Sequence, residues 1–150
     1  MRLTNFTDYT LRVLIYLGAH RDKESLTTVG EIATAYGISE NHLTKVVHHL
    51  AGQGYVETIR GNGGGVRLSR APDTINIGAV VRGAEEDFAI VECFRDGNAK
   101  CPIAPVCALS SVLGNAVHAF FEVLDKQTLA DLLKPRGKLL RLFRDAGTSQ

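Results

Sequence analysis

Three cysteines are the residues of this sequence whose type and spacing most clearly allow chemistry. Cys93, Cys101 and Cys107 fall within fifteen residues, and the 150-residue chain has no other cysteine. An odd number of thiols cannot all pair within one chain, and structural disulfides are rare in reducing compartments. The glycine, asparagine and prolines between them predict a loop. We therefore expect a metal-ligand set for zinc, copper or an iron–sulfur cluster, completed by a ligand from elsewhere.

Two other states of these thiols stay open. Zinc bound together with a distant histidine is compatible with the spacing alone, and reduced, unligated thiols are a further alternative. A thiolate nucleophile would need a positioned base and a cleft. The sequence contains no such arrangement, so we do not expect an enzyme.

A second group of polar residues belongs to a predicted helix-turn-helix. Thr28 and Glu31 have the spacing of a capping box that opens one helix, and Gly37 ends that helix. Ser39 is a candidate N-cap for the next helix, which runs to about residue 51. Two helices joined by so short a glycine-containing turn form a helix-turn-helix, and the second is the expected recognition helix.

The polar face of the recognition helix has side chains suited to DNA. Asparagine bonds adenine, lysine reaches guanine acceptors or phosphate, and threonine contacts the thymine methyl group. A merely solvated helix face is the alternative. His42, His48 and His49 also invite a metal site, but phosphate contact or simple exposure is favoured. The DNA-contacting residues expected on this helix are Ser39, Asn41, His42, Thr44, Lys45 and His48.

A predicted β-hairpin follows, with strands at 55–60 and 66–69 around a glycine-rich turn at 61–65. Helix, helix and hairpin in this order predict a winged helix. Four glycines in a five-residue turn carry an entropic cost, which we interpret as a need for backbone to lie against DNA. The DNA-contacting residues expected in this wing are Arg60, Asn62 and Arg67.

The remaining pattern is helical, so the predicted fold class is mainly α with a small β-hairpin wing and a long dimerisation helix. Apolar residues at three- and four-residue steps predict helices over roughly 4–20 and 109–123. The second has little to pack against in its own chain, which favours dimerisation, with packing on the winged helix as the alternative. We expect one domain with four parts: a winged helix-turn-helix (1–85), a cysteine loop (86–108), a dimerisation helix region (109–133) and a C-terminal tail (134–150).

Composition excludes few kinds of partner. The net charge is +1 and 45% of the residues are hydrophobic, values that are ordinary for a globular chain and do not indicate nucleic-acid binding. No stretch approaches the ~20 apolar residues of a membrane span, and the first residues lack the apolar segment of a secretory signal. We expect a cytoplasmic protein without a membrane partner.

Several motifs, taken together, resemble a known family over nearly the whole chain. They are LTNFTDY at 3–9, NHLTKVV at 41–47, GYV at 54–56, RGNGGGVRL at 60–68, CPIAPVC at 101–107, LD at 124–125 and TLADL at 128–132. The resemblance is to the NsrR-type nitric-oxide-sensing repressors, whose winged-helix family also contains the iron–sulfur regulator IscR.

The resemblance implies a homodimeric repressor that binds a palindromic operator in double-stranded DNA and responds to nitric oxide. It implies an iron–sulfur cluster held by Cys93, Cys101 and Cys107 and by a residue of the partner subunit, for which Asp8 stands at the matching position. IscR-type relatives use a histidine three residues after the last cysteine, where this sequence has Ser110. That difference favours [4Fe–4S] over [2Fe–2S]. The gap from Cys93 to Cys101 is longer than the family pattern.

Other interpretations remain beside this one. A related regulator would sense iron–sulfur or redox status, an electron carrier would need no recognition helix, and a zinc-stapled DNA-binding protein would contain no cluster. Without the resemblance, Asp8 in the first turn of a helix would be explained by the helix dipole alone.

Overall fold

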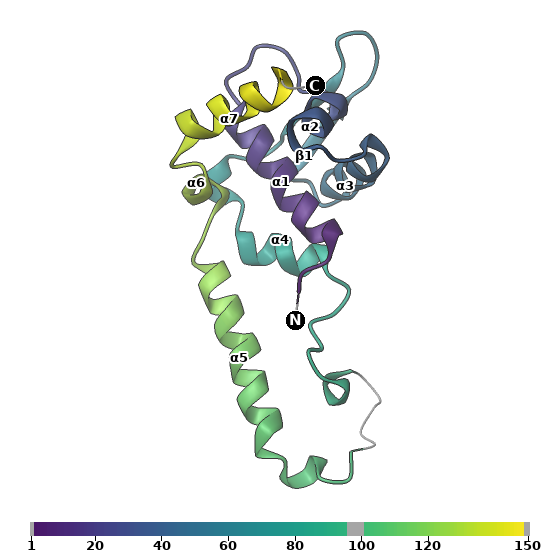
Figure 1. The fold of residues 1–150 in the computed structure, drawn as a ribbon, viewed down its shortest axis with the longest axis vertical. Helices are drawn as coiled ribbons and strands as arrows, with labels where there is room; N and C mark the ends of the chain where they lie inside the picture. Colours follow the sequence, from purple (N-terminus) through teal and green to yellow (C-terminus); the bar gives the residue numbers. More distant parts are fainter. Residues whose placement is uncertain (1, 96–100, 149–150) are drawn as a thin grey trace.

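The long axis of the molecule runs from a group of helices around a two-stranded sheet to the far end of one long helix (Figure 1). The computed structural model describes residues 2–95 and 101–148. Its elements are α1 (Asn5–Ala19), α2 (Val29–Tyr36), α3 (Glu40–Gly52), β1 (Val56–Ile59), β2 (Gly65–Leu68), η1 (Pro72–Thr74), α4 (Ile77–Ala84), η2 (Glu92–Phe94), η3 (Ala104–Val106), α5 (Ala108–Asp125), α6 (Leu129–Leu132) and α7 (Arg136–Thr148). Within the described residues, none of these helices is long and apolar enough to span a membrane.

Local capping residues shape the helix-turn-helix as the sequence predicts. Thr28 Oγ1 accepts a hydrogen bond from the backbone N–H of Glu31, and the Glu31 carboxylate accepts one from the N–H of Thr28 at 2.6 Å. Gly37 ends α2 with a φ of +63°, a left-handed conformation that glycine adopts at little cost. Ser39 is the N-cap residue of α3, although its side chain makes no capping hydrogen bond. The short turn at 37–39 therefore follows directly from the sequence.

The predicted wing is present as an antiparallel hairpin of β1 and β2, in which Glu57 lies opposite Arg67. Val56 and Val66 are buried beneath the hairpin. Because side chains alternate along a strand, Glu57 and Arg67 project from the outer face. Thr27 pairs with Val66 through two backbone hydrogen bonds, which tie the base of the wing to the segment before α2.

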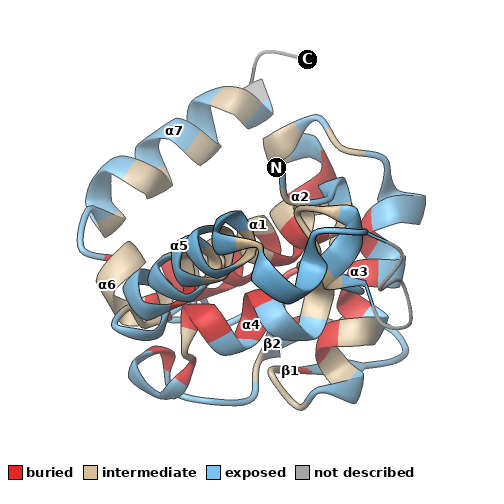
Figure 2. Cartoon of the chain, turned by 90° about the horizontal axis from the view of Figure 1, so that it is seen from below, coloured by how far each residue is buried: buried red, intermediate tan, exposed pale blue. Residues whose placement is uncertain are grey.

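The core lies where α1 packs against α3, α4 and the wing. Leu14, Ile32, Leu43 and Leu50 are among the largest side chains without solvent exposure. Burying each such aliphatic side chain contributes about 1.5–3 kcal/mol. Figure 2 shows buried residues concentrated in α1, α3 and α4, whereas α5 is mostly exposed or half-buried.

α5 has two different apolar faces. One face packs on α4 through Phe121, and the Arg82 guanidinium lies over the Phe121 ring, 4.1 Å from its centroid. Arg82 also forms a two-pronged ion pair with Asp125 at the end of α5, with N–O distances of 2.6 and 2.7 Å. The most exposed apolar side chains of the other face, each 62% exposed, are Leu109, Val112 and Val123. Packing within the chain thus applies to one face of α5. Leu109 and Val123, the two ends of the predicted apolar pattern, lie on the other face.

The C-terminal tail forms helix α7, which lies at the surface of the molecule, since none of its described side chains is buried. α7 packs on α2, and the Phe143 ring lies 4.9 Å from the ring of Tyr16 and 5.3 Å from that of Tyr36. Arg136 at its start donates a hydrogen bond to the carbonyl of Ala19 at 2.7 Å. Aromatic residues of α1 and α2 provide an apolar surface that the isolated tail pattern did not reveal.

Candidate nucleic-acid interface and cysteine segment

The outer face of α3 carries the predicted recognition residues. Leu43, Val46 and Leu50 are fully buried on the inner face, which fixes the rotation of the helix. The residues expected to contact DNA are all exposed: Ser39, Asn41, His42, Thr44, Lys45 and His48. Thr44 Oγ1 donates to the carbonyl of Glu40 at 2.8 Å. Because its hydroxyl is engaged within the helix, a contact of Thr44 with thymine would use its methyl group.

The arginines of the wing region have three different environments. Arg67 Nε donates to Glu57 Oε1 at 2.5 Å, across a rung of the hairpin. Arg70 donates to the carbonyl of Gln53 at the end of α3, at 3.1 Å, and its guanidinium also lies over a tyrosine ring. Arg60 has no side-chain hydrogen bond or ion pair within the described residues. The wing residues predicted to contact DNA are all exposed: Arg60, Asn62 and Arg67.

The glycines of the wing turn are required by the backbone conformation and close packing of the turn itself. Gly61 and Gly63 have φ values of +101° and +74°. A Cβ atom on Gly64 would lie 2.3 Å from the carbonyl oxygen of Ile59, and one on Gly65 would lie 2.6 Å from a backbone oxygen of the segment before α2. The glycine content therefore follows from the fold of the wing and does not by itself indicate contact with DNA.

The three cysteines lie between α4 and α5, in a segment with little packing of its own. Cys93 is in η2, Cys101 precedes η3, and Cys107 is the N-cap residue of α5. Neither η2 nor η3 has a buried residue. All three thiols are free, with Cys93 and Cys101 exposed and Cys107 half-buried, while residues 96–100 lie outside the described residues. Among the described residues, no three His, Cys, Asp or Glu side chains are close enough together to hold a metal ion.

The donor set nevertheless fits an iron–sulfur cluster in its chemistry. Cysteine thiolates are the ordinary ligands of such clusters, and these thiols carry no disulfide. A segment with few buried contacts rearranges around a ligand at little cost in packing. Three thiolates leave one ligand position of a four-ligand site to be filled from outside the segment.

Asp8 lies in the first turn of α1 and is partly exposed, not joined to the cysteine segment. Its carboxylate accepts from Arg12 Nε at 2.8 Å, and the two side chains are 46% and 42% exposed. The Arg12 guanidinium also lies over the ring of Tyr36, 5.5 Å from its centroid. Tyr36 is largely buried, and this burial raises the pKa of its phenol to about 12. Asp8 is therefore linked through Arg12 to the last residue of α2.

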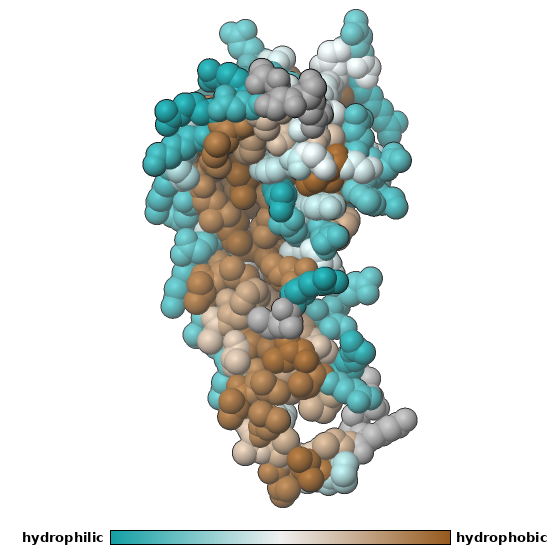
Figure 3. Space-filling model, in the orientation of Figure 1, coloured by the Kyte–Doolittle hydropathy of each residue, from teal (hydrophilic) through white to brown (hydrophobic). Residues whose placement is uncertain are grey.

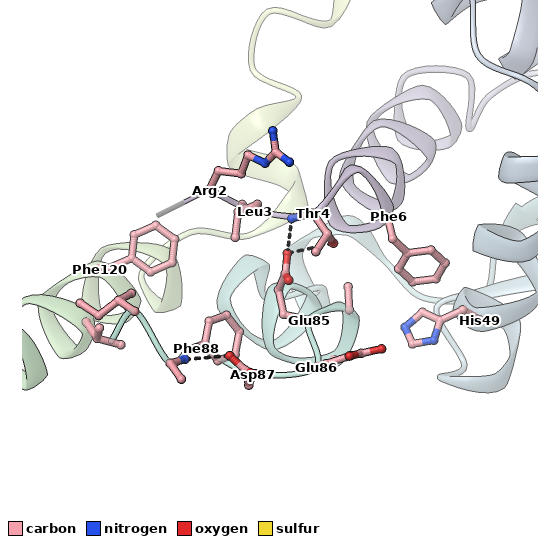
Figure 4. A pocket seen from close by; sticks show the side chains of 15 residues that line it. Arg2, Leu3, Thr4, Phe6, His49, Glu85, Glu86, Asp87, Phe88 and Phe120 are labelled. Carbon is pink, nitrogen blue, oxygen red and sulfur yellow. Dashed lines mark hydrogen bonds between the residues drawn. The ribbon is translucent and has the colours of Figure 1, made fainter. Parts of the chain in front are cut away.

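An open cleft of about 1070 Å³ lies between the N-terminal segment, the loop after α4 and α5 (Figure 4). The backbone N–H of Thr4 donates to Glu85 at 2.7 Å, which joins two of its sides. Phe88 and Phe120 contribute aromatic surface, and His49 of α3 lies at its edge. None of the predicted cluster ligands lines this cleft, but Phe120 of α5 forms part of its wall.

Sequence reasoning missed three charged residues of these surfaces. Arg12 follows Asp8 by four residues, a spacing that predicts an ion pair on a helix. The alternation of the two predicted strands puts Glu57 and Arg67 on the same face of the hairpin, but the predicted bounds would pair Arg67 with Ile59. Only the observed register, in which Ile59 pairs with Gly65, sets Glu57 directly opposite Arg67. Arg70 offered no such signal, because its partner belongs to a separate element.

The helix-turn-helix and its wing define the class of this protein: it is a winged-helix transcription regulator, mainly α with a two-stranded sheet, as the sequence predicts. A family model described as Rrf2, iron-dependent transcriptional regulator, matches residues 3–135. The chain belongs to the Rrf2 family. The resemblance found in the sequence is thereby confirmed at the level of the family.

Curated relatives and solved structures agree with this assignment. The HTH-type transcriptional regulator NsrR of Bacillus subtilis (strain 168) is 54% identical over 144 residues, covering 96% of this chain and 98% of that protein. NsrR of Geobacillus kaustophilus is 50% identical over 145 residues, covering 97% and 98%. The structure of T. potens IscR has a TM-score of 0.71 at 27% identity and covers 90% of this chain and 88% of its own. CymR, the global cysteine regulator of B. subtilis, has a TM-score of 0.67 at 32% identity, covering 88% and 95%. The two NsrR proteins and CymR are named as regulators.

Proposed function

We propose that this chain is a cytoplasmic, homodimeric repressor that binds a palindromic DNA operator and responds to nitric oxide through an iron–sulfur cluster. The observation that carries the proposal is the position of three free thiols in the segment between α4 and α5, the last of them at the N-cap of α5. The other end of this helix is tied to α4 of the winged helix by the Arg82–Asp125 ion pair. The similarity to NsrR proteins at 50% identity and above supports the same function.

DNA binding is assigned to residues 1–85. The exposed face of α3 enters the major groove, where Asn41 and Lys45 near its start meet base edges first. The wing lies beside the duplex, where Arg60 and Arg67 reach phosphates or the minor groove. Asn62 is exposed at the turn of the wing and extends this surface.

Dimerisation is assigned to the exposed apolar face of α5, in the region 109–133. Figure 3 shows apolar residues gathered over the part of the surface that α5 forms. A contiguous apolar surface of this kind marks an interaction site, and through Phe120 it continues into the cleft. A second copy of the chain covers this face in the proposed dimer. Two recognition helices then meet successive major grooves, about 34 Å apart or a multiple of that distance.

The proposed cluster ligands are Cys93, Cys101 and Cys107 of one subunit and the carboxylate of Asp8 from the other. Ser110 occupies the position of the IscR-type histidine, which favours [4Fe–4S] over [2Fe–2S]. When bound, such a cluster supplies iron that reacts with nitric oxide. A carboxylate is a weaker donor to this iron than thiolate, so the Asp8 link between subunits is the easiest to lose. Because it would join two subunits, this link couples the cysteine segment to the geometry of the dimer.

Anaerobic purification of the full-length chain and selection from a pool of random-sequence DNA duplexes test this function. We expect brown protein with iron and sulfide, an enriched palindrome, and affinity that falls roughly 5- to 150-fold when nitric oxide is added. Colourless protein with stoichiometric zinc would refute the cluster. Failure to enrich any duplex would refute operator binding.

A further inference from the structure

We propose that Glu57 limits the affinity of the wing for DNA by neutralising Arg67. This inference rests on the proposed DNA-binding function. It states that one carboxylate helps to set the affinity of that binding. Glu57 is thus a positioning residue that acts through Arg67 and does not itself contact DNA.

The geometry that carries the inference is a cross-strand ion pair. Glu57 and Arg67 are directly opposite in the register of β1 and β2, and Arg67 Nε lies 2.5 Å from Glu57 Oε1. Both side chains project outward, because Val56 and Val66 fill the inner face of the hairpin. The Glu57 side chain is 46% exposed and that of Arg67 is 59% exposed. The pair therefore lies on the surface where the wing would approach a duplex.

The other two arginines show that this pairing is particular to Arg67. Arg70 donates a hydrogen bond to a backbone carbonyl at the end of α3, so it has a structural role and holds the wing to the recognition helix. Arg60 has no hydrogen bond or ion pair within the described residues. Of the three, Arg67 alone has its charge balanced by a carboxylate among the described residues.

Neutralisation matters because phosphate contacts dominate the affinity of proteins for DNA. Each cation that neutralises a phosphate contributes about 0.9 to the slope of log K against log salt. A phosphate that approaches Arg67 must share its guanidinium with a carboxylate held 2.5 Å from Nε, and that carboxylate repels the phosphate. Glu57 therefore lowers both the affinity and the salt dependence that Arg67 would otherwise provide.

The overall charge of the chain is consistent with such a limit. A net charge of +1 in 150 residues gives little non-specific attraction to DNA. A regulator that must release its operator on a signal cannot bind DNA too tightly, because the coupling between the signal site and the DNA site typically changes affinity only about 5- to 150-fold. The Glu57–Arg67 pair keeps the contribution of the wing small.

The test compares the full-length wild-type protein with Glu57→Gln on two duplexes. One is the duplex that the wild type enriches from a random pool, and the other is an unrelated duplex of equal length. Glutamine keeps an oxygen for the Arg67 hydrogen bond, so the hairpin stays folded, which thermal unfolding checks. Asp73→Asn in η1 is the matched control, because it makes the same charge change at an exposed site on the α6 side of the molecule.

We expect Glu57→Gln to bind both duplexes about three- to tenfold more tightly at 0.1 M salt, with a steeper salt slope by up to about one unit. Asp73→Asn should leave both quantities unchanged. Most of the gain should be absent when Arg67→Gln is present in the same chain. Unchanged or weaker binding by Glu57→Gln refutes the inference, as does an equal gain in the Arg67→Gln background. Absence of DNA binding by the wild type would instead refute the proposed function.

Discussion

Arg12 donates from Nε to a carboxylate oxygen of Asp8 at 2.8 Å, so the proposed fourth cluster ligand is already engaged by its own helix. Ion pairs of this kind, four residues apart and partly exposed, contribute only about 0.3–0.5 kcal/mol. An exchange of Arg12 for a stronger partner would therefore cost Asp8 little. The same guanidinium lies over the ring of Tyr36 at the end of α2. Such an exchange would therefore also change the contact of Arg12 with the first helix of the helix-turn-helix.

Asp8→Ala should lower the iron content of anaerobically purified protein and speed its loss of colour in air, because a donor is removed. Arg12→Ala is the matched control, since it breaks the same ion pair but leaves the carboxylate in place. Iron analysis and visible absorption measure both variants. Iron content and spectrum of Asp8→Ala equal to those of the wild type would show that Asp8 is not a ligand.

Val112→Glu should weaken the proposed dimer, because it places a charge on the exposed apolar face of α5. We expect the dimer Kd measured by sedimentation to rise at least tenfold, which corresponds to about 1.4 kcal/mol. Ser111→Glu is the control, since position 111 is exposed on the same helix but is turned about 100° away from Val112. Equal sedimentation of Val112→Glu and wild type across a dilution series would place the interface elsewhere.

Much of the fold could be predicted because its signals are local. The capping box of Thr28 and Glu31, the left-handed Gly37 and the alternation of the wing strands all act within a few residues. The packing of α7 was missed because it depends on aromatic residues brought together from α1 and α2, far away in the sequence. The exposed face of α3 was predictable in the same way, from its buried leucines and valines.

The candidate site was predictable in its residue types but not in its assembly. Cys93, Cys101 and Cys107 are clustered in sequence, yet the described residues of one chain do not join them to Asp8. A ligand shared between subunits, as proposed for Asp8, would leave no local pattern in a single sequence. The wing glycines have a further explanation that the sequence did not reveal, because Gly64 meets a steric need within the chain whether or not the turn contacts DNA.

Gly64→Ala should distort the wing, because its Cβ would lie 2.3 Å from the carbonyl oxygen of Ile59 and 2.9 Å from that of Gly61. Backbone atoms cannot move aside as a side chain can, so we expect a loss of about 1–3 kcal/mol in the free energy of unfolding. DNA affinity should fall with it. Gly83→Ala in α4 meets nothing within 4 Å and should gain up to about 1 kcal/mol from helix propensity. Urea unfolding of both variants measures the difference, and equal stability would contradict the steric explanation.

Asp131→Ala should lower the free energy of unfolding at neutral pH but change it little at pH 2. The backbone N–H of Thr128 donates to the Asp131 carboxylate at 2.9 Å, and this bond, with Lys134 and the Thr128 hydroxyl, lowers the pKa of Asp131 to about 2. An unfolded aspartate titrates near about 3.9, so the carboxylate stabilises the fold above that pH. Its contribution is lost as the pH falls from about 4 to about 2.

Urea unfolding of the wild type and Asp131→Ala between pH 6 and pH 2 measures this loss, with the two curves converging at the acid end. Lys134→Ala is the control, because it removes an ion pair but keeps the capping bonds from Thr128. Since the backbone bond is the largest cause of the lowered pKa, this control should retain most of the pH dependence of the wild type. A constant difference between wild type and Asp131→Ala over the whole range would mean that α6 does not depend on this carboxylate for its cap.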